Sequence, residues 1–429
     1  MSGTASVEAA AWLTRLKAAA RARFDASGIP QAHDEDWRQT DVRPLASFAA
    51  TVAAAASVPA ELVGALPYAS ALPLRAVLVN GRFDGGLSSL NALPRGVRVR
   101  SLAAVLSESP ESLEPHLAHA APEDKAPFVA LNTALFTDGI VVTIGAGVEA
   151  EAPVHIVHVS VAGASPATVH ARTLVIAEAG SKLTLVETFV GLGPGPYLTN
   201  AVTEILAAPD AHVAHVKIQS ETAAGWHVAT VAGLQQRGAQ LVSHNISLGA
   251  ALARNDIGSK LDGPGAECRL YGLYVVDGAQ HVDNHTWLDH AKAHCPSWEM
   301  YKGLLAGKSR AVFNGRIIVR EGAQKTDAKQ SNKNLILGDS AKVYTRPQLE
   351  IYANDVKCTH GATIGRLDEE SLFYLRTRGI GGEEARNILI RAFADDLIDH
   401  LPVPELRVLL SDALHARLEG GLASVAGAA

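Results

Sequence analysis

Gly180-Ser181-Lys182-Leu183 is a short phrase in which turn residues lead into an apolar strand residue, and similar phrases recur along the chain. They are Pro209-Asp210-Ala211-His212-Val213, Gly238-Ala239-Gln240-Leu241, Gly265-Ala266-Glu267-Cys268 and Gly338-Asp339-Ser340-Ala341-Lys342-Val343. The first four begin 29, 29 and 27 residues apart, and the fifth follows after 73, so we expect one or two irregular or longer units before it. Such a period, with strand residues and no helices between, predicts a solenoid of stacked strand coils.

The segment from residue 138 to 366 has the composition of short strands. Val, Ile, Leu and Thr cluster in runs that Gly, Pro, Asp and Asn interrupt, for example at residues 173–176, 183–186, 213–218, 241–246 and 316–319. The first set of residues favours strands and the second favours turns. We therefore predict a mainly β protein with its solenoid core at residues 138–366. An antiparallel sandwich with regular hairpins remains open, because the repeat is faint.

Helical patterns precede this core. The region 1–65 is predicted to be helical, because its apolar residues follow helical spacing until Gly28-Ile29-Pro30 ends the run; they are Trp12, Leu13, Leu16, Ala20 and Phe24. Residues 49–56 are a second, alanine-rich helical candidate. Residues 66–137 are predicted as a mixed α/β region leading into the core, with a strand at 75–79 and a short helix at 102–106.

A helical domain is predicted after the core, at residues 367–429. Asp368 can cap a helix over residues 369–376, and Pro404 stands near the start of another over residues 403–418. Glu383 and Glu384 begin the helix between them, which carries an apolar stripe at Ala385, Ile388, Leu389, Ala392, Phe393 and Leu397. The tail, residues 419–429, is expected to fray.

Composition excludes several classes of protein. The chain has 429 residues, with 38 Lys+Arg against 44 Asp+Glu, so no basic excess points to nucleic acid. The longest apolar runs, such as residues 140–144, are too short to span a bilayer, and the N-terminus does not resemble a secretory signal. The three cysteines lie far apart and cannot form a disulfide framework, so we expect a cytoplasmic location.

The phrase Cys358-Thr359-His360 places a thiol and an imidazole two residues apart. Residues 348–353 before it alternate polar and apolar, as in a strand, and residues i and i+2 of a strand share a face. Cys358 and His360 could therefore hold a soft or borderline metal together, although a closed zinc site needs four ligands. The alternative is a buried thiol beside a hydrogen-bonded imidazole.

A histidine-rich stretch contains His281, His285, His290 and His294. On a strand His281, Asp283 and His285 would share one face, but zinc pairings with short fixed spacers are absent. Hydrogen-bond ladders along a solenoid wall are therefore the favoured interpretation. Cys268 is expected in the core, and Cys295 has no clear role.

Two catalytic signatures are missing. Gly303-Leu304-Leu305-Ala306-Gly307-Lys308-Ser309 has three residues where a phosphate loop needs four, and no helix is predicted after it. We therefore predict no ATP site, so a partner must supply any ATP hydrolysis. No nucleophile elbow or credible triad is found either.

Several long phrases, in order, resemble the SufB/SufD family of subunits of the Suf iron–sulfur cluster assembly scaffold. They are Trp37-Arg38-Gln39-Thr40-Asp41-Val42-Arg43-Pro44-Leu45, Gln280-His281-Val282-Asp283-Asn284-His285-Thr286, Phe313-Asn314-Gly315-Arg316-Ile317, Gln330-Ser331-Asn332-Lys333-Asn334-Leu335-Ile336-Leu337, Asn354-Asp355-Val356-Lys357-Cys358-Thr359-His360-Gly361-Ala362-Thr363-Ile364-Gly365 and Phe373-Tyr374-Leu375-Arg376-Thr377-Arg378-Gly379-Ile380. The resemblance spans roughly residues 30–400. Around the Cys-x-His phrase the chain is more similar to SufD than to SufB.

The resemblance implies a right-handed parallel β-helix flanked by helical domains. It also implies a scaffold subunit that is not an enzyme itself and that forms a complex with SufB and the ATPase SufC, which hydrolyses the ATP. In the family, the residues matching Cys358 and His360 lie at the SufB interface, where a transient iron–sulfur cluster is thought to form. SufC would dock on the C-terminal helices. We expect its surface at Ile388, Leu389, Phe393 and Leu397 with Arg386 and Arg391.

Other functions remain open from the sequence. The chain could be a SufB-like paralogue with the main scaffold role, or a carbohydrate-active β-helix protein. A zinc protein using His281, His285 and Cys358 is a further alternative. The isolated chain could pair with itself through solenoid edges. The resemblance does not decide whether a flavin joins the complex.

Overall fold

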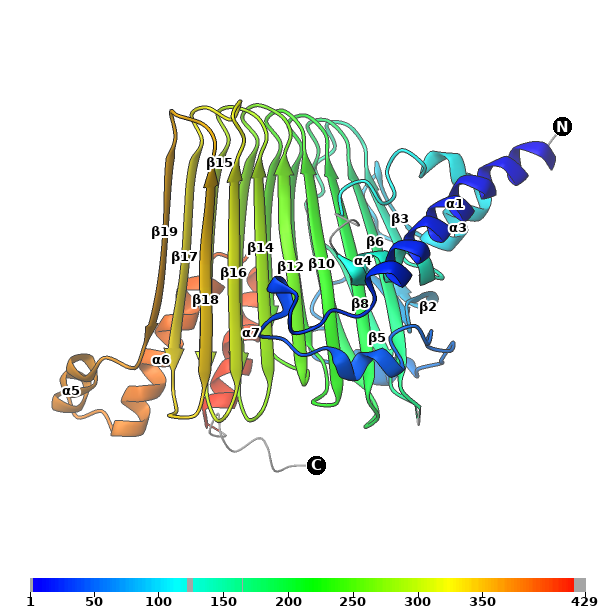
Figure 1. The fold of residues 1–429 in the computed structure, drawn as a ribbon. Helices are drawn as coiled ribbons and strands as arrows, with labels where there is room; N and C mark the ends of the chain where they lie inside the picture. Colours follow the sequence, from blue (N-terminus) through cyan, green and yellow to red (C-terminus); the bar gives the residue numbers. More distant parts are fainter. Residues whose placement is uncertain (1–2, 122–125, 164, 420–429) are drawn as a thin grey trace.

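The core is a solenoid of two facing sheets, seen in a computed structural model that describes residues 3–121, 126–163 and 165–419 (Figure 1). One sheet has ten strands in the order β19-β17-β15-β13-β11-β9-β7-β5-β1-β2, and the other has nine in the order β18-β16-β14-β12-β10-β8-β6-β4-β3. Each sheet takes every second strand, so each coil adds one strand to each sheet. The predicted β-helix core with helical flanks is confirmed, and the antiparallel sandwich is excluded because successive core strands of each sheet pair in parallel.

The ten-stranded sheet consists of β1 (Arg75–Val79), β2 (Arg82–Ser89), β5 (Val154–Val161), β7 (Lys182–Leu192), β9 (His212–Ser220), β11 (Gln240–Ser247), β13 (Glu267–Val276), β15 (Pro296–Leu305), β17 (Asp327–Ile336) and β19 (Lys357–Gly365). The nine-stranded sheet consists of β3 (Val97–Ser101), β4 (Ile140–Ile144), β6 (Ala167–Ala177), β8 (Tyr197–Ala207), β10 (Gly225–Gln235), β12 (Leu252–Leu261), β14 (His281–His290), β16 (Arg310–Val319) and β18 (Lys342–Ile351). The helices are α1 (Gly3–Ser27), α2 (Ala60–Ala65), α3 (Leu102–Glu108), α4 (Pro127–Leu135), α5 (Glu369–Thr377), α6 (Gly382–Ile398) and α7 (Pro404–Glu419), and the 3-10 turns are η1 (Glu35–Trp37), η2 (Arg43–Ser47) and η3 (Pro110–Ser112). No helix of the described residues is long and apolar enough to cross a membrane.

One backbone feature marks the turns from the nine-stranded to the ten-stranded sheet. From β4–β5 to β16–β17, each of these turns holds a residue with positive φ: Gly147, Gly180, Asp210, Gly238, Gly265, His294 and Lys325. The repeat phrase found the turns with Gly180, Asp210, Gly238 and Gly265, where Gly or Asp is usual for this conformation, but missed those with Gly147, His294 and Lys325. The expectation of irregular units after residue 265 was therefore wrong. The phrase at Gly338 lies between β17 and β18, at the opposite end of the coils.

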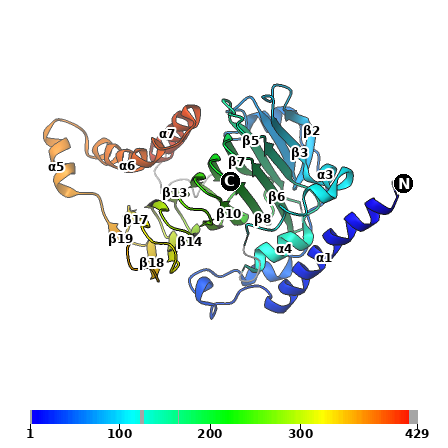
Figure 2. The same ribbon diagram turned by 90° about the horizontal axis from the view of Figure 1, so that it is seen from above.

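The N-terminal region packs mainly on the nine-stranded sheet (Figure 2). Helix α1 ends at Ser27, as predicted, and the strand at 75–79 and the helix beginning at Leu102 also form. The helix expected at residues 49–56 was wrong. That segment is extended, because the amide of Ala53 donates to Thr168 O (2.9 Å) and the amide of Thr168 donates to Thr51 O (2.7 Å). Pairing with the start of β6 thus overrides the helical propensity of alanine.

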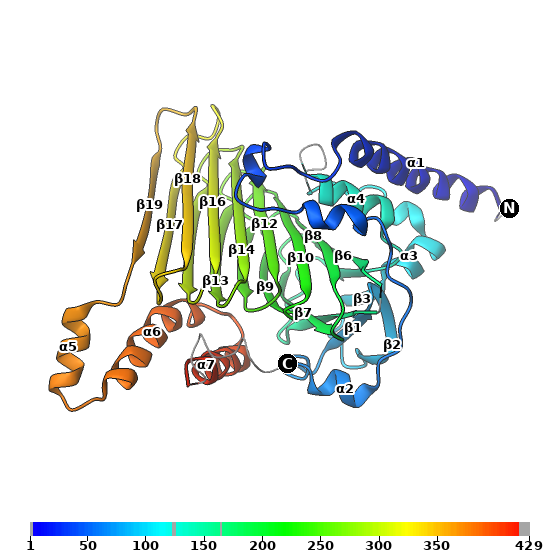
Figure 3. The ribbon, with the colours of Figure 1, turned by 60° about the horizontal axis from the view of Figure 1, so that its bottom comes forward.

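The C-terminal helices α6 and α7 pack on the ten-stranded sheet near its β13–β15 strands, while α5 lies beyond β19 (Figure 3). The predicted cap is present, since Asp368 accepts a hydrogen bond from the amide of Ser371 at 2.8 Å. The predicted apolar stripe of α6 was only partly right. Its buried residues are Ala385, Ile390, Ala394, Leu397 and Ile398, because the helix is covered both by α7 and by the sheet. Most of the tail expected to fray lies outside the described residues.

Candidate functional site

The solenoid ends in two free edges, β18 and β19 (Figure 3). Cys358 and His360 lie on β19, in register with Ala328 and Gln330 of β17. Both partners are buried on the inner face of the sheet, so Cys358 and His360 also face inward, at the mouth of the solenoid. Large apolar residues are exposed at the same end: Tyr344, Ile351, Tyr352 and Ile364.

Cys358 differs from the other two cysteines in its access to solvent. All three thiols are free, but Cys268 and Cys295 are fully buried, whereas Cys358 is half-buried. The Sγ of Cys295 donates to Gly263 O at 3.3 Å. Burial raises the pKa of Cys358, a backbone hydrogen bond at Ala328 partly opposes this, and Asp327 adds to the rise, so the neutral thiol is favoured over the thiolate. Among the cysteines, Cys358 is the one that an ion at the mouth could reach.

One strand face carries His281, Asp283 and His285, as predicted. These side chains belong to a network that holds the N-terminal segment. Asp283 accepts hydrogen bonds from Thr40 Oγ1 (2.5 Å) and Arg254 Nη1 (2.7 Å), and its other oxygen lies 3.1 Å from His285 Nε2. Burial opposes ionisation of Asp283, but Arg254 and His285 lower its pKa. Since Arg254 also donates to Asp36 O at 2.7 Å, this network fastens the N-terminal segment to the outside of the nine-stranded sheet.

The histidines and Cys358 do not form a zinc site. His281 and His285 lie on the outer face of one sheet, and Cys358 lies on the inner face of the other. His290 Nε2 is 3.0 Å from Ser297 Oγ in the interior, and His294 occupies a positive-φ turn. Within the residues that the structure describes, no three His, Cys, Asp or Glu side chains are gathered so that they could hold a metal ion. A site at Cys358 and His360 therefore needs ligands from elsewhere.

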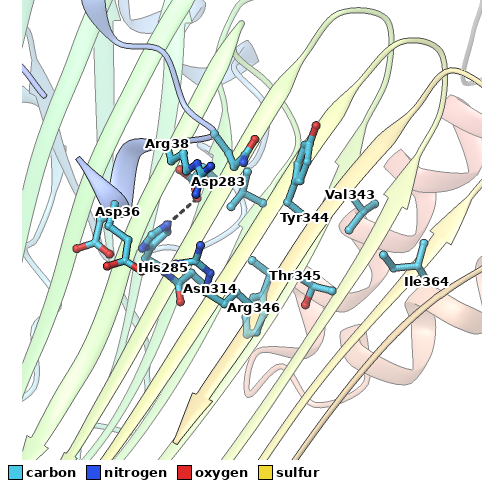
Figure 4. A pocket seen from close by; sticks show the side chains of 14 residues that line it. Asp36, Arg38, Asp283, His285, Asn314, Val343, Tyr344, Thr345, Arg346 and Ile364 are labelled. Carbon is cyan, nitrogen blue, oxygen red and sulfur yellow. Dashed lines mark hydrogen bonds and ion pairs between the residues drawn. The ribbon is translucent and has the colours of Figure 1, made fainter. Parts of the chain in front are cut away.

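A groove with a volume of about 390 Å³ runs along the β18 edge (Figure 4). His285, Asn314 and Arg346 line it from neighbouring strands, and Asp36 and Arg38 form a wall from the N-terminal segment. Arg346 Nη1 is 2.8 Å from Glu35 Oε1 across the groove. The groove is open and of mixed charge, and it adjoins the unpaired backbone of β18.

Sequence reasoning missed the charged groups inside the solenoid. Glu187 lies 3.0 Å from His158 Nε2 and 3.0 Å from His215 Nε2. Burial alone would raise the pKa of Glu187, but these two histidines hold it well below its ordinary value. Burial lowers the pKa of Lys217 to about 7, and its Nζ donates to Asn255 Oδ1 at 2.7 Å. The available signal was the alternation His215-Val216-Lys217-Ile218-Gln219, which places polar side chains on the inner face.

The segment resembling a phosphate loop is a turn between strands. Gly303 to Leu305 end β15, Gly307 has a φ of 59°, and Arg310 begins β16. A phosphate loop instead joins a strand to a helix. The buried amino group of Lys302 beside this segment is held by Asp396 of α6, which fastens the C-terminal helices to the sheet.

The helical surface expected to bind a partner needs correction. Ile388 and Arg386 are exposed, but Leu397 is fully buried, and Leu389, Phe393 and Arg391 are partly buried. Leu397 therefore belongs to the packing between the helices and the solenoid. Other apolar residues are exposed on these helices: Phe373, Tyr374, Val408 and Leu409.

Comparisons with known proteins agree along most of the chain. A family model described as SUF system FeS cluster assembly, SufBD core domain, matches residues 158–393, and one described as SufBD protein N-terminal region matches residues 4–156. The iron–sulfur cluster assembly protein SufD of Escherichia coli is 33% identical over 410 residues, 92% of this chain and 90% of that protein. An iron–sulfur cluster assembly SufBD family protein of Synechocystis is 30% identical over 397 residues, 91% and 87% of the two chains. The chloroplastic protein ABCI7 of Arabidopsis thaliana is 35% identical over 240 residues, 55% of this chain and 50% of that protein.

Proposed function

Because the chain belongs to the SufBD family of iron–sulfur cluster assembly proteins, we propose that it is a non-enzymatic scaffold subunit that builds a cluster jointly with a second chain. The observation that carries this proposal is the inward-facing pair of Cys358 and His360 at the free end of the solenoid. Cluster iron prefers thiolate ligands, and imidazole can replace thiolate on an iron. Two ligands from one chain leave the remaining positions to a partner and keep the cluster releasable.

The partner is a SufB-like subunit that pairs with β18 and β19. Free strand edges expose a row of unpaired backbone groups, which a strand of another chain can satisfy. The exposed side chains of Tyr344, Tyr352 and Ile364 surround these edges, and their burial would add to the backbone pairing. The groove beside β18 would receive polar side chains of the same partner, because its walls offer both charges. When no partner is present, two copies of this chain could pair by these edges.

A SufC-like ATPase would dock on the C-terminal helices and supply the ATP hydrolysis. Ile388, Val408 and Leu409 give α6 and α7 an apolar exposed surface, with Arg386 close by in the sequence. These helices are fastened to β15 through Lys302 and Asp396, so movement of the helices can reach the solenoid. We place the assembly in the cytoplasm, where thiols stay reduced.

Co-expression with the partner subunits tests the proposal. Cys358→Ala and His360→Ala should each lower the iron and acid-labile sulfide that co-purify anaerobically with the complex. Thr359→Ala is a matched control, because Thr359 lies between them and faces the other way. Cys295→Ala controls for the loss of any thiol. Iron and sulfide at the wild-type level in both site variants would refute a ligand role.

A further inference from the structure

Three inward-facing side chains form a row across the last strands of the ten-stranded sheet. Glu299 of β15 is in register with Gln330 of β17, and Gln330 is in register with His360 of β19. Neighbouring strands lie about 4.8 Å apart, so each side chain is beside the next. Glu299 and Gln330 are buried, whereas His360 is exposed. The row therefore leads from the interior to the candidate site.

The amide of Gln330 is held in one orientation. Its Nε2 donates to Glu299 Oε2 at 2.7 Å, and this oxygen accepts whether Glu299 is ionised or carries its proton on Oε1. On the facing sheet, Gly315 leaves room for this amide, because a Cβ built there would lie 2.2 Å from Gln330 Nε2. The amide nitrogen thus faces Glu299 and β16.

The carbonyl oxygen of Gln330 is left without a partner. Oε1 is buried and has no hydrogen-bond partner among the described residues. Buried polar atoms in folded proteins are nearly always paired, so an unpaired acceptor next to a functional site needs an explanation. With the amide nitrogen fixed on Glu299, the remaining neighbour in register is His360, whose ring carries an N–H in either tautomer.

We propose that Gln330 is a positioning residue for His360, in which Oε1 accepts the ring N–H and leaves the other ring nitrogen free at the mouth of the solenoid. This inference rests on the proposed function. A histidine that binds a metal usually donates its other N–H to a fixed acceptor, which sets the tautomer and the ring orientation. Gln330 supplies such an acceptor without adding charge, and Glu299 keeps it from rotating.

Ring nitrogen NMR of the full-length chain tests the contact directly. With ¹⁵N-labelled histidine, the His360 signals are identified by their absence in His360→Asn. Gln330→Met should shift these signals towards the tautomer mixture of a free histidine. Asn332→Leu is the matched control, because it removes a buried amide one inward position further along β17, opposite Ala362. Unchanged His360 signals in Gln330→Met would overturn the proposal.

A pair of Glu299 variants guards against a general loss of structure. Glu299→Gln keeps an acceptor for the amide of Gln330 and should preserve the His360 signals, whereas Glu299→Leu frees the amide and should shift them. Equal effects of the two variants would overturn the proposal. In the co-purified complex, Gln330→Met should weaken iron binding by about 10-fold or more, the usual effect of losing such a supporting acceptor.

Different results would refute the positioning role of Gln330 and the ligand role of His360. Loss of cluster in His360→Ala with unchanged ring signals in Gln330→Met refutes the positioning role and leaves the proposed function. Full cluster content in His360→Ala refutes the ligand role, and with it the positioning proposal.

Discussion

Replacing Glu299 with Gln should stabilise the solenoid, and the gain should grow as the pH rises. Burial raises the pKa of Glu299 from 4.5 to about 7, although the nearby Thr286 hydroxyl and the hydrogen bond from Gln330 partly oppose the shift. The folded chain therefore keeps a proton that the unfolded chain releases between these two values. Stability linked to this group is highest below about pH 4.5 and is lost as the pH rises to about 7.

The size of the effect follows from the pKa shift. Each pKa unit is worth about 1.4 kcal/mol, so the penalty for ionising Glu299 in the folded chain grows by about 2–3 kcal/mol between about pH 5 and about pH 8. Glu299→Gln removes the titration but keeps the shape and the acceptor for Gln330. The advantage of the variant over the wild type should therefore increase by this amount over that range.

Urea unfolding at the two pH values, followed by circular dichroism, measures this difference. Comparing variant with wild type at each pH cancels the contributions of other titrating groups, provided that the transitions keep the same slope. Glu321→Gln is the control, because Glu321 is exposed. A stability difference that is the same at both pH values would refute the reasoning, since it would mean that water or local opening solvates Glu299.

Three further outcomes follow from the structure. Arg172→Met should destabilise the chain by about 3–5 kcal/mol in urea unfolding, because it leaves the fully buried Glu204 carboxylate without its cation. At the positive-φ turns, His294→Gly should stabilise by about 0.5–1 kcal/mol and Gly265→Ala should cost about 1 kcal/mol; effects of equal sign would contradict the role of these turns. On α6, Leu397→Ala should cost about 2–5 kcal/mol, because Leu397 is buried. Ile388→Asp should leave thermal stability nearly unchanged but weaken co-purification of the ATPase, and undiminished binding would place the dock elsewhere.

The solenoid could be predicted from the sequence because its turns repeat and because runs of strand-forming residues lie between them. The repeat could be recognised only in part, because the feature that repeats is a positive-φ turn conformation. His294 and Lys325 adopt this conformation without the Gly or Asp that usually marks it in a sequence. The segment at residues 49–56 could not be predicted, because its extended form depends on pairing with Thr168, more than 100 residues away in the chain.

The candidate pair Cys358 and His360 could be identified from local spacing, since strand alternation alone puts both side chains on one face. The residues that surround this pair could not be predicted from the local sequence. The fixed amide of Gln330 depends on the register of β15, β17 and β19, and register across coils is a product of the whole fold. The buried face of α6 likewise depends on two packing partners, α7 and the ten-stranded sheet. A single apolar stripe in the sequence can indicate only one buried side of a helix.

The charged groups between the sheets also have a consequence for how the chain finds its fold. Coils of similar length could stack in the wrong order, with one coil skipped. Apolar contacts alone would not distinguish this arrangement from the correct one. Glu187 on β7 needs His158 from the coil before it and His215 from the coil after it. Skipping a coil would leave the buried Glu187 carboxylate without one of its two histidines. These buried pairs therefore favour the correct order of coils over an order in which one coil is skipped.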